Sequence, residues 1–334
     1  MRKFYILGMT ILLIFSLCLT NIFAQDIREE REEKTEATKI MQTKPTQDYK
    51  FSSRINLFFG YDSNANLSPL KKGDFFEQFI YSFNFNKSLW EGIKFSLDYD
   101  FGVLNYQEYT DISNLLNHLR LELNKKFSLF RAGIGYDLDY FYYLHSDYDF
   151  LFHKGFFYLR QDFKKGLYHK LQLEYGYKDY LEIKALDNDL FTYQDNERQD
   201  KRYSVEYSLG IRPLPKLSFL FKTKFSSNDS NSRYLKFYDY KTYQGTFGFE
   251  YALLKNTTLV SNFIYRRKNY TGRIIISGEN KQKDDLYVGN LGLRYKLNRQ
   301  NALSLFYTYR NNHSNEDLDE YLEHVITAGW QYTF

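Results

Sequence analysis

Apolar and polar side chains alternate along most of the chain after residue 50. Between residues 93 and 103, every odd-numbered position is apolar and every even-numbered position is polar or glycine. Successive side chains of a β-strand point to opposite faces, so such a segment has one apolar face and one wet face. The same alternation recurs at intervals as far as residue 334, which predicts an all-β protein.

The alternating segments are long enough to cross a membrane. Most of them reach the about nine to eleven residues that a tilted transmembrane strand needs, whereas strands of soluble sandwiches are shorter. We expect fourteen strands, over residues 51–61, 75–86, 93–104, 115–124, 127–144, 150–163, 167–180, 201–211, 217–226, 240–253, 258–270, 285–297, 302–311 and 321–334.

The connections between these segments alternate between short and long. Short turns are expected near residues 87–92, 125–126, 164–166, 212–216, 254–257 and 298–301. Longer polar loops are expected near 62–74, 105–114, 145–149, 181–200, 227–239, 271–284 and 312–320. This asymmetry is typical of outer-membrane barrels, and only helices or closed barrels pair every backbone amide inside a bilayer. The predicted fold is a transmembrane antiparallel up-and-down β-barrel of 14 strands over residues 51–334.

Composition supports this class and excludes others. Aromatic residues make up 20% of the 334 residues, with 33 Tyr and 31 Phe, which argues against disorder and suits the aromatic girdles of barrels. A mean hydropathy of −0.57 excludes a bundle of transmembrane helices. The net charge of +4 is too small for a nucleic-acid footprint, and the single Cys excludes a disulfide framework.

The first 24 residues indicate a cleaved secretory signal peptide. Basic residues at 2–3 precede an apolar run over residues 4–20, and Ala24 stands before a polar residue. An uncleaved membrane anchor is the alternative, although the run is shorter than the about 20 residues that span a bilayer. A lipoprotein signal at Cys18 is disfavoured because no small residue immediately precedes it.

A short polar segment separates the signal from the first strand. Residues 25–50 carry seven acidic and six basic side chains and one aromatic residue. Opposite charges three and four positions apart would support a helix, but the apolar stripe is too thin for a stable coiled coil. We interpret this segment as a periplasmic linker, and the alternative is a contact segment for a periplasmic partner or a plug.

The end of the chain resembles a known assembly signal. Apolar or aromatic residues occupy alternate positions from Ile326 to the terminal Phe334, including Trp330 and Tyr332. This pattern resembles the C-terminal signal of outer-membrane proteins of Gram-negative bacteria. The resemblance implies insertion of the protein into outer-membrane lipid by the barrel-assembly machinery, with Trp330, Tyr332 and Phe334 as the signal residues.

The end of the first expected strand carries a second resemblance. The stretch Gly60–Leu67 is similar to the strand–loop opening of putative outer-membrane porins linked to polysaccharide export. It is also similar to the barrel of surface lipoprotein assembly modifiers, which has fourteen strands. This likeness implies an export or assembly accessory as an alternative to a channel.

The wet face of the strands is predicted to line a pore. The acidic candidates come from the earlier strands, as Asp98, Asp100, Asp137, Asp139 and Glu174, and the basic candidates from three later strands, as Arg266, Arg294 and Arg310. In a closed barrel the two sets would lie on opposing walls and create a transverse field. The alternative is a solvated lumen in which nearby Lys and Arg balance the acids.

Catalytic, metal and cofactor sites are not predicted. No Ser stands in a motif with His145 or His118, and the acidic loops at 187–189 and 316–320 do not match calcium-loop spacing. We therefore expect no enzymatic activity, no metal, no cofactor and no nucleic-acid partner. The leading hypothesis is a porin that passes small hydrophilic solutes passively. The alternatives are an export or assembly accessory barrel for polysaccharide or surface lipoproteins, and a structural surface barrel.

Overall fold

The structure is a computed structural model that describes residues 49–90, 92–163, 166–276 and 280–334. The expected signal peptide and nearly all of the expected linker lie outside the described residues. One compact unit, residues 48–334, contains all the described strands. The first strand begins at Tyr49, two residues before the expected boundary.

Fourteen strands make up this unit. They are β1 (Tyr49–Asp62), β2 (Asp74–Trp90), β3 (Ile93–Tyr106), β4 (Asn114–Lys126), β5 (Arg131–Tyr143), β6 (Phe150–Asp162), β7 (Leu167–Leu186), β8 (Tyr193–Leu214), β9 (Leu217–Ser230), β10 (Tyr240–Ala252), β11 (Thr257–Ile274), β12 (Lys281–Lys296), β13 (Asn301–Ser314) and β14 (Tyr321–Thr333). Within the described ranges, three short 3-10 helices lie in the longer connections, η2 (Thr110–Ile112), η4 (Tyr234–Lys236) and η5 (Asp317–Asp319). Among the described residues, no helix is long and apolar enough to cross a membrane.

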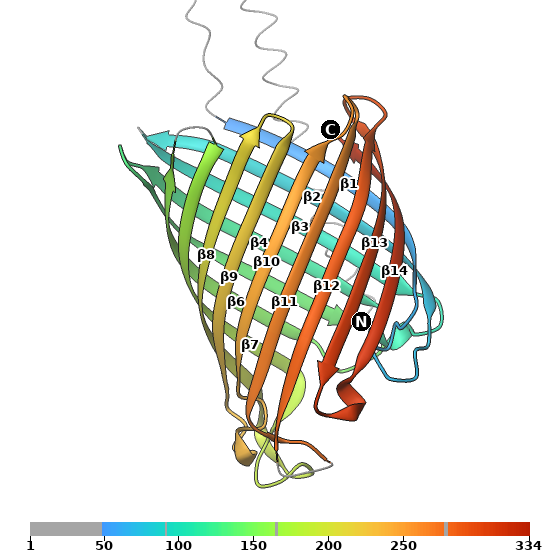
Figure 1. Cartoon of the computed structure of the whole chain (residues 1–334). Helices are drawn as coiled ribbons and strands as arrows, with labels where there is room; N and C mark the ends of the chain where they lie inside the picture. The colour runs from blue at the N-terminus through green and yellow to red at the C-terminus, as the bar shows by residue number, and fades with distance from the viewer. Residues whose placement is uncertain (1–48, 91, 164–165, 277–279) are drawn as a thin grey trace, which may run out of the picture. The chain divides into compact units, whose positions relative to one another are not determined.

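The strands form a closed antiparallel barrel in which each strand pairs with its sequence neighbours (Figure 1). The ring closes where β1 pairs with β14, from Arg54 opposite Thr333 to Asp62 opposite Val325. Closure leaves no unpaired sheet edge, which satisfies the backbone in lipid. The predicted fold class is therefore confirmed.

Short and long connections separate to the two ends of the barrel, as expected. Strands β8 and β9 are joined by residues 215–216, whereas residues 63–73 join β1 to β2. The C-terminus lies at the short-turn end, at the top of Figure 1, and the η4 and η5 loops lie at the other end. We call these the turn end and the loop end.

Several strand boundaries differ from the expected ones, and two connections are changed by this. Residues 181–200 were expected to form a loop, but β7 and β8 continue through most of this stretch because the two strand ends pair with each other, with register shifts after Asp179. The turn expected at 125–126 lies instead at 127–130, where the Phe127 amide donates to the Phe130 carbonyl at 2.8 Å. The two rings stack at 4.7 Å, so aromatic side chains here stabilise a turn and do not extend the strand.

The outer face of the barrel is apolar. Phe59 is 62% exposed, Ile134 62% and Leu305 55%, while Asn56, Asp137 and Ser204, on the opposite face of the same barrel, are buried. Leaving a large apolar side chain in water forgoes about 1.5–3 kcal/mol of burial energy, and dozens of such side chains lie outside. The outer face therefore contacts lipid, and the apolar column predicted from the sequence faces outward.

Candidate functional site: the inner wall of the barrel

All eight predicted pore-lining side chains belong to the inner face. Asp98 and Asp100 alternate along β3 with the outward residues Leu97, Tyr99 and Phe101, and cross-strand register carries this face from strand to strand. The remaining candidates share this face on β5, β7, β11, β12 and β13. In a ring of fourteen strands β4 lies across the lumen from β11, so the acidic and basic sets face each other approximately.

The carboxylates of the first acidic row have polar partners nearby. Register places Arg120 between Asp98 and Asp137. The Arg120 guanidinium lies 3.4 Å from Asp137 and 3.2 Å from Glu122. Asn84 donates to Asp98 at 2.7 Å. These carboxylates therefore have partners on neighbouring strands.

The second acidic row is paired in the same way. Register aligns Asp100 with His118 and His118 with Asp139. The His118 Nδ1 atom lies 2.5 Å from Asp139, and the Lys154 ammonium donates to the other Asp139 oxygen at 2.7 Å. The wall formed by β3–β6 thus carries a polar network in which cations and acids alternate across the strands.

The remaining candidates divide into paired and unpaired groups. Glu174 accepts a hydrogen bond from Lys224 at 3.3 Å, and Arg310 contacts the buried Glu323 at 2.7 Å. Arg266 and Arg294 form no ion pair within the described residues. Local pairing of most charges favours the balanced lumen over two opposed fields of pure sign.

Aromatic rings also line the inner wall, which the alternation did not predict. Tyr168 lies over Gly210, where a Cβ atom would meet the ring at 2.0 Å, and Phe306 covers Gly292 in the same way. Each ring lies directly across the strand pair from its glycine. A glycine aligned opposite an aromatic residue is the sequence signal for these contacts, but it requires the register to be known.

Cations and aromatic rings alternate along the inner wall near the loop end. Lys178, Arg202 and Lys268 contact the rings of Phe150, Phe152, Tyr180, Tyr240 and Tyr270. We call these eight residues the cation–aromatic row. None of its members was a sequence candidate, although Lys178 and Lys268 each stand two positions before a Tyr, on the same face of a strand.

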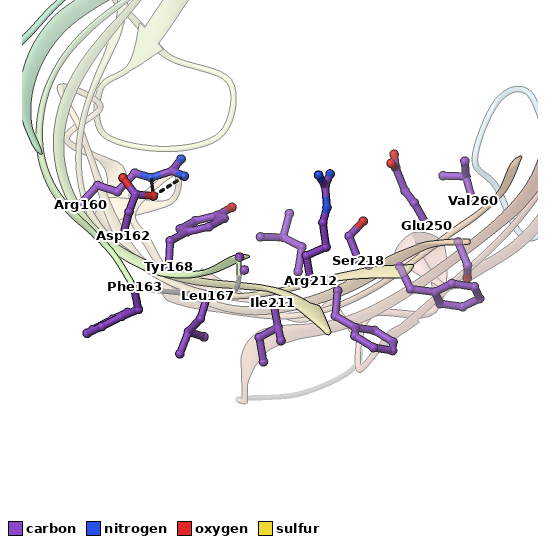
Figure 2. Close-up of a pocket in the computed structure, with 17 residues that line it drawn as sticks. Arg160, Asp162, Phe163, Leu167, Tyr168, Ile211, Arg212, Ser218, Glu250 and Val260 are labelled. Carbon is purple, nitrogen blue, oxygen red and sulfur yellow. Dashed lines mark hydrogen bonds and ion pairs between the residues drawn. The ribbon is translucent and has the colours of Figure 1, made fainter. Parts of the chain in front are cut away.

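A cavity of about 540 Å³ opens at the turn end, between β6 and β11. Figure 2 shows Arg160, Tyr168, Arg212 and Glu250 on its concave side, whereas Phe163, Leu167 and Ile211 point away to the outer face. Arg160 contacts Asp162 at 2.7 Å and lies 3.8 Å from the centre of the Tyr168 ring. The lining of this vestibule is mixed, with charged, aromatic and aliphatic side chains, and the vestibule is open to solvent.

The three residues of the predicted assembly signal lie at the turn end of β14. The Trp330 indole donates to Asn301 at 3.1 Å and stacks on Tyr332 at 6.1 Å, and Tyr332 meets Phe334 edge-on at 4.9 Å. The Phe334 amide donates to the Ser53 carbonyl at 3.0 Å. The signal residues thus form one outward aromatic column beside the closing strand pair.

The strand–loop motif after Gly60 has a structural role. The amide of Ser63 donates to the His324 carbonyl at 2.9 Å, and the fully buried Asn64 side chain donates to Leu322 and Ser68 carbonyls at 3.1 and 2.8 Å. These bonds continue the β1–β14 contact beyond the strand ladder. We call this region, Asp62–Asn64 with Leu322–His324, the seam extension.

Within the described ranges, no three His, Cys, Asp or Glu side chains gather closely enough to hold a metal ion. The acidic loop at 187–192 instead bonds its own backbone. Asp189 accepts the amide protons of Phe191 at 2.7 Å and Thr192 at 2.6 Å, which lowers the pKa of this carboxyl.

Comparison with known proteins identifies the architecture. No protein-family model and no curated protein sequence matches the chain. Among solved structures, OmpT of Vibrio cholerae superposes with a TM-score of 0.51 at 10% identity, covering 86% of this chain and 97% of that one. An anion-selective porin from Comamonas acidovorans gives 0.50 at 9% identity, covering 86% and 99%. The chain has the fold of a bacterial outer-membrane barrel. Identities this low show the fold alone. The closed barrel fold together with its apolar outer face places the chain in the bacterial outer membrane.

Proposed function

We propose that the protein is a porin-like channel, without enzymatic activity, for passive diffusion of small hydrophilic solutes. The observation that carries this proposal is the exposure of a charged side chain on the inner face in the middle of the barrel. Arg266 points inward from the middle of β11, is nevertheless exposed and forms no ion pair within the described residues. A charge without a partner is stable there only in contact with water, so a hydrated path along the lumen explains this side chain.

The barrel wall suits solutes that keep their hydration. Its paired acids and bases offer donors and acceptors without a strong net field on β3–β6. Side chains on all walls narrow a fourteen-strand barrel to a pore of roughly 10–15 Å. Sugars, amino acids and hydrated ions fit this width.

Single-channel recording tests the proposal. The full chain, refolded and inserted into planar bilayers, should give a stable ohmic conductance that is steady over minutes. Liposomes containing the protein should swell in arabinose faster than in raffinose, because the pore excludes larger sugars. A heat-modifiable, folded barrel that is electrically silent and does not permit swelling would contradict the proposal.

A further inference from the structure

The cation–aromatic row spans five strands at the loop-end mouth of the barrel. Tyr240 is the first residue of β10, and register aligns it with Asn228, which in turn is aligned with Arg202 on β8, and with Tyr270 on β11. Lys268 is the next inward-facing residue of β11 from Tyr270 towards the turn end. Lys178 is the next inward-facing residue of β7 from Gly176 towards the loop end, and Gly176 is the register partner of Arg202. The three cations therefore occupy one region of the inner wall.

Each cation of the row is held by aromatic faces. The Lys178 ammonium lies 3.5 Å from the Phe150 ring centre and 4.2 Å from that of Tyr180. Lys268 lies 4.3 Å from Tyr240 and 4.2 Å from Tyr270. A ring quadrupole attracts a cation without neutralising it, so these contacts position the charge and leave its sign intact.

The nearest carboxylates are bonded to other groups. Asp200, opposite Lys178 in the register, contacts Arg198 at 2.6 Å. Asp284, opposite Lys268, accepts hydrogen bonds from Gln282 at 2.9 Å and Ser314 at 2.8 Å. Across the described ranges, Lys178, Arg202 and Lys268 take part in no ion pair within 4.0 Å. This differs from the β3–β6 wall, where Arg120 and Lys154 both contact acids.

Two of the three tyrosine hydroxyls of the row, those of Tyr240 and Tyr270, are set to donate. Arg202 donates to the Tyr240 oxygen at 2.5 Å, and Lys268 donates to the Tyr270 oxygen at 2.5 Å. A phenolic oxygen that accepts from a cation keeps its own proton for another acceptor. Neither hydroxyl donates to an acceptor in the parts of the chain described by the structure. The region thus combines three basic side chains that have no ion-pair partner in the described residues with two available O–H donors.

We propose that this region is a binding site for small organic anions that carry a carboxylate, such as acidic sugars, on their way into the pore. Charge-assisted bonds from Arg202, Lys178 and Lys268 would hold the carboxylate, and the Tyr240 and Tyr270 hydroxyls would bond its remaining lone pairs. The inference rests on the proposed channel function and adds a solute class to it. Its position near the loop end places it at the entrance for solutes that arrive from that side.

Current block by D-glucuronate tests this site, with uncharged D-glucose as the reference solute. Glucuronate added to the loop side should reduce the wild-type current at concentrations where glucose has no effect. Removing one charge-assisted contact, in Lys178→Met or Arg202→Met, should weaken the block about tenfold. Tyr240→Phe, which keeps the ring and removes the hydroxyl, should weaken it less.

Lys241→Met is the matched control, because Lys241 is the neighbour of Tyr240, faces outward and is exposed. It removes the same charge and should leave the block unchanged. Equal block by glucose and glucuronate, or equal affinity in the Met variants and wild type, would overturn the site. A preserved conductance in the same recordings would show that the proposed channel function still stands. If the barrel is silent, calorimetric titration of the folded, detergent-solubilised protein with glucuronate decides the question, and an absence of heat rejects the site.

Discussion

Single side chains on the inner wall differ in what they stabilise. Arg310 bonds a nearly fully buried carboxylate, Glu323, whereas Arg266 projects into open space and Arg294 has no acidic partner in the described ranges. The three arginines look equivalent in the sequence because each occupies a wet position of its strand. In the structure, Arg310 forms an ion pair with a buried acid, whereas Arg266 and Arg294 remain available to ions in the lumen.

Arginine substitutions should separate these roles. Arg266→Ala and Arg294→Ala should shift the reversal potential towards cations, by about twofold in permeability ratio, because each removes an uncompensated positive charge from the wall. Arg310→Ala should instead destabilise the barrel by about 3 kcal/mol, since it leaves a buried carboxylate unpaired. Reversal potentials in a KCl gradient and urea unfolding measure the two effects. Unchanged selectivity in both of the first variants would remove them from the pore lining.

Two glycines of β12 offer a test of ring packing. A Cβ atom at Gly292 would meet the Phe306 ring at 2.0 Å, whereas one at Gly289 would meet nothing within 4 Å. Gly292→Ala should therefore cost about 1–3 kcal/mol of unfolding free energy through overpacking, and Gly289→Ala should be close to neutral. Urea unfolding in lipid vesicles, followed by Trp fluorescence, compares the pair. Equal midpoints would show that Phe306 moves aside freely.

At the loop end, the connections between strands are held by hydrogen bonds between side chains and backbone groups. In the 187–192 connection, the Asp189 carboxylate accepts two amide protons, and in the seam extension Asn64 donates to two carbonyls. Both residues are of the type that stabilises turns locally. These contacts hold loops that have no apolar core of their own.

Acidification should release the 187–192 connection. The folded-state pKa of Asp189 lies below its ordinary value of 3.8, so its stabilisation is present above that value and is lost as the pH falls through the lowered pKa. Hydrogen-exchange protection of the Phe191 and Thr192 amides should be high at about pH 6 and fall below pH 3.8. Asp189→Ala should show low protection throughout. Wild-type protection that does not change with pH would contradict the assignment.

Asn64 should be far less tolerant of substitution than its neighbour Asn66. Asn64→Ala removes three hydrogen bonds of a fully buried side chain and leaves two carbonyls and the Ser68 amide without their partner, at about 1–3 kcal/mol. Asn66 is exposed, so Asn66→Ala should change the unfolding free energy by no more than about 0.5 kcal/mol. Urea midpoints of the two variants check the difference, and similar losses would mean that the seam extension does not depend on Asn64.

At the scale of the whole molecule, the sequence predicted the architecture because one physical rule acts on every strand. Lipid outside and water inside impose a period of two, and residues 93–103 follow it without exception. The alternation is not maintained in all strand segments that extend beyond the lipid. The segment 194–199 of β8 is polar on both faces, so its alternation is lost although its backbone still pairs with β7, where Leu181, Ile183 and Ala185 keep the period of two.

The functional wall was less predictable, because its chemistry lies between strands. Asp98, Arg120 and Asp137 are 22 and 17 positions apart, and only the register brings them into one row. The same holds for Lys268, which contacts Tyr240 on the neighbouring strand. Local alternation assigns a side chain to a face but contains no information about which residue lies beside it.

The closing strand pair has one more consequence. The Ser53 carbonyl accepts a hydrogen bond from the Phe334 amide, so the described part of the chain starts and finishes at the turn end, on the adjacent strands β1 and β14. In a closed ring of strands that follow one another in sequence, the termini could lie at any connection. Joining Phe334 to Tyr49 through a brief tether and opening the chain anew at residues 187–192 should yield a circular permutant with identical neighbours all round, whose aromatic terminus is now internal.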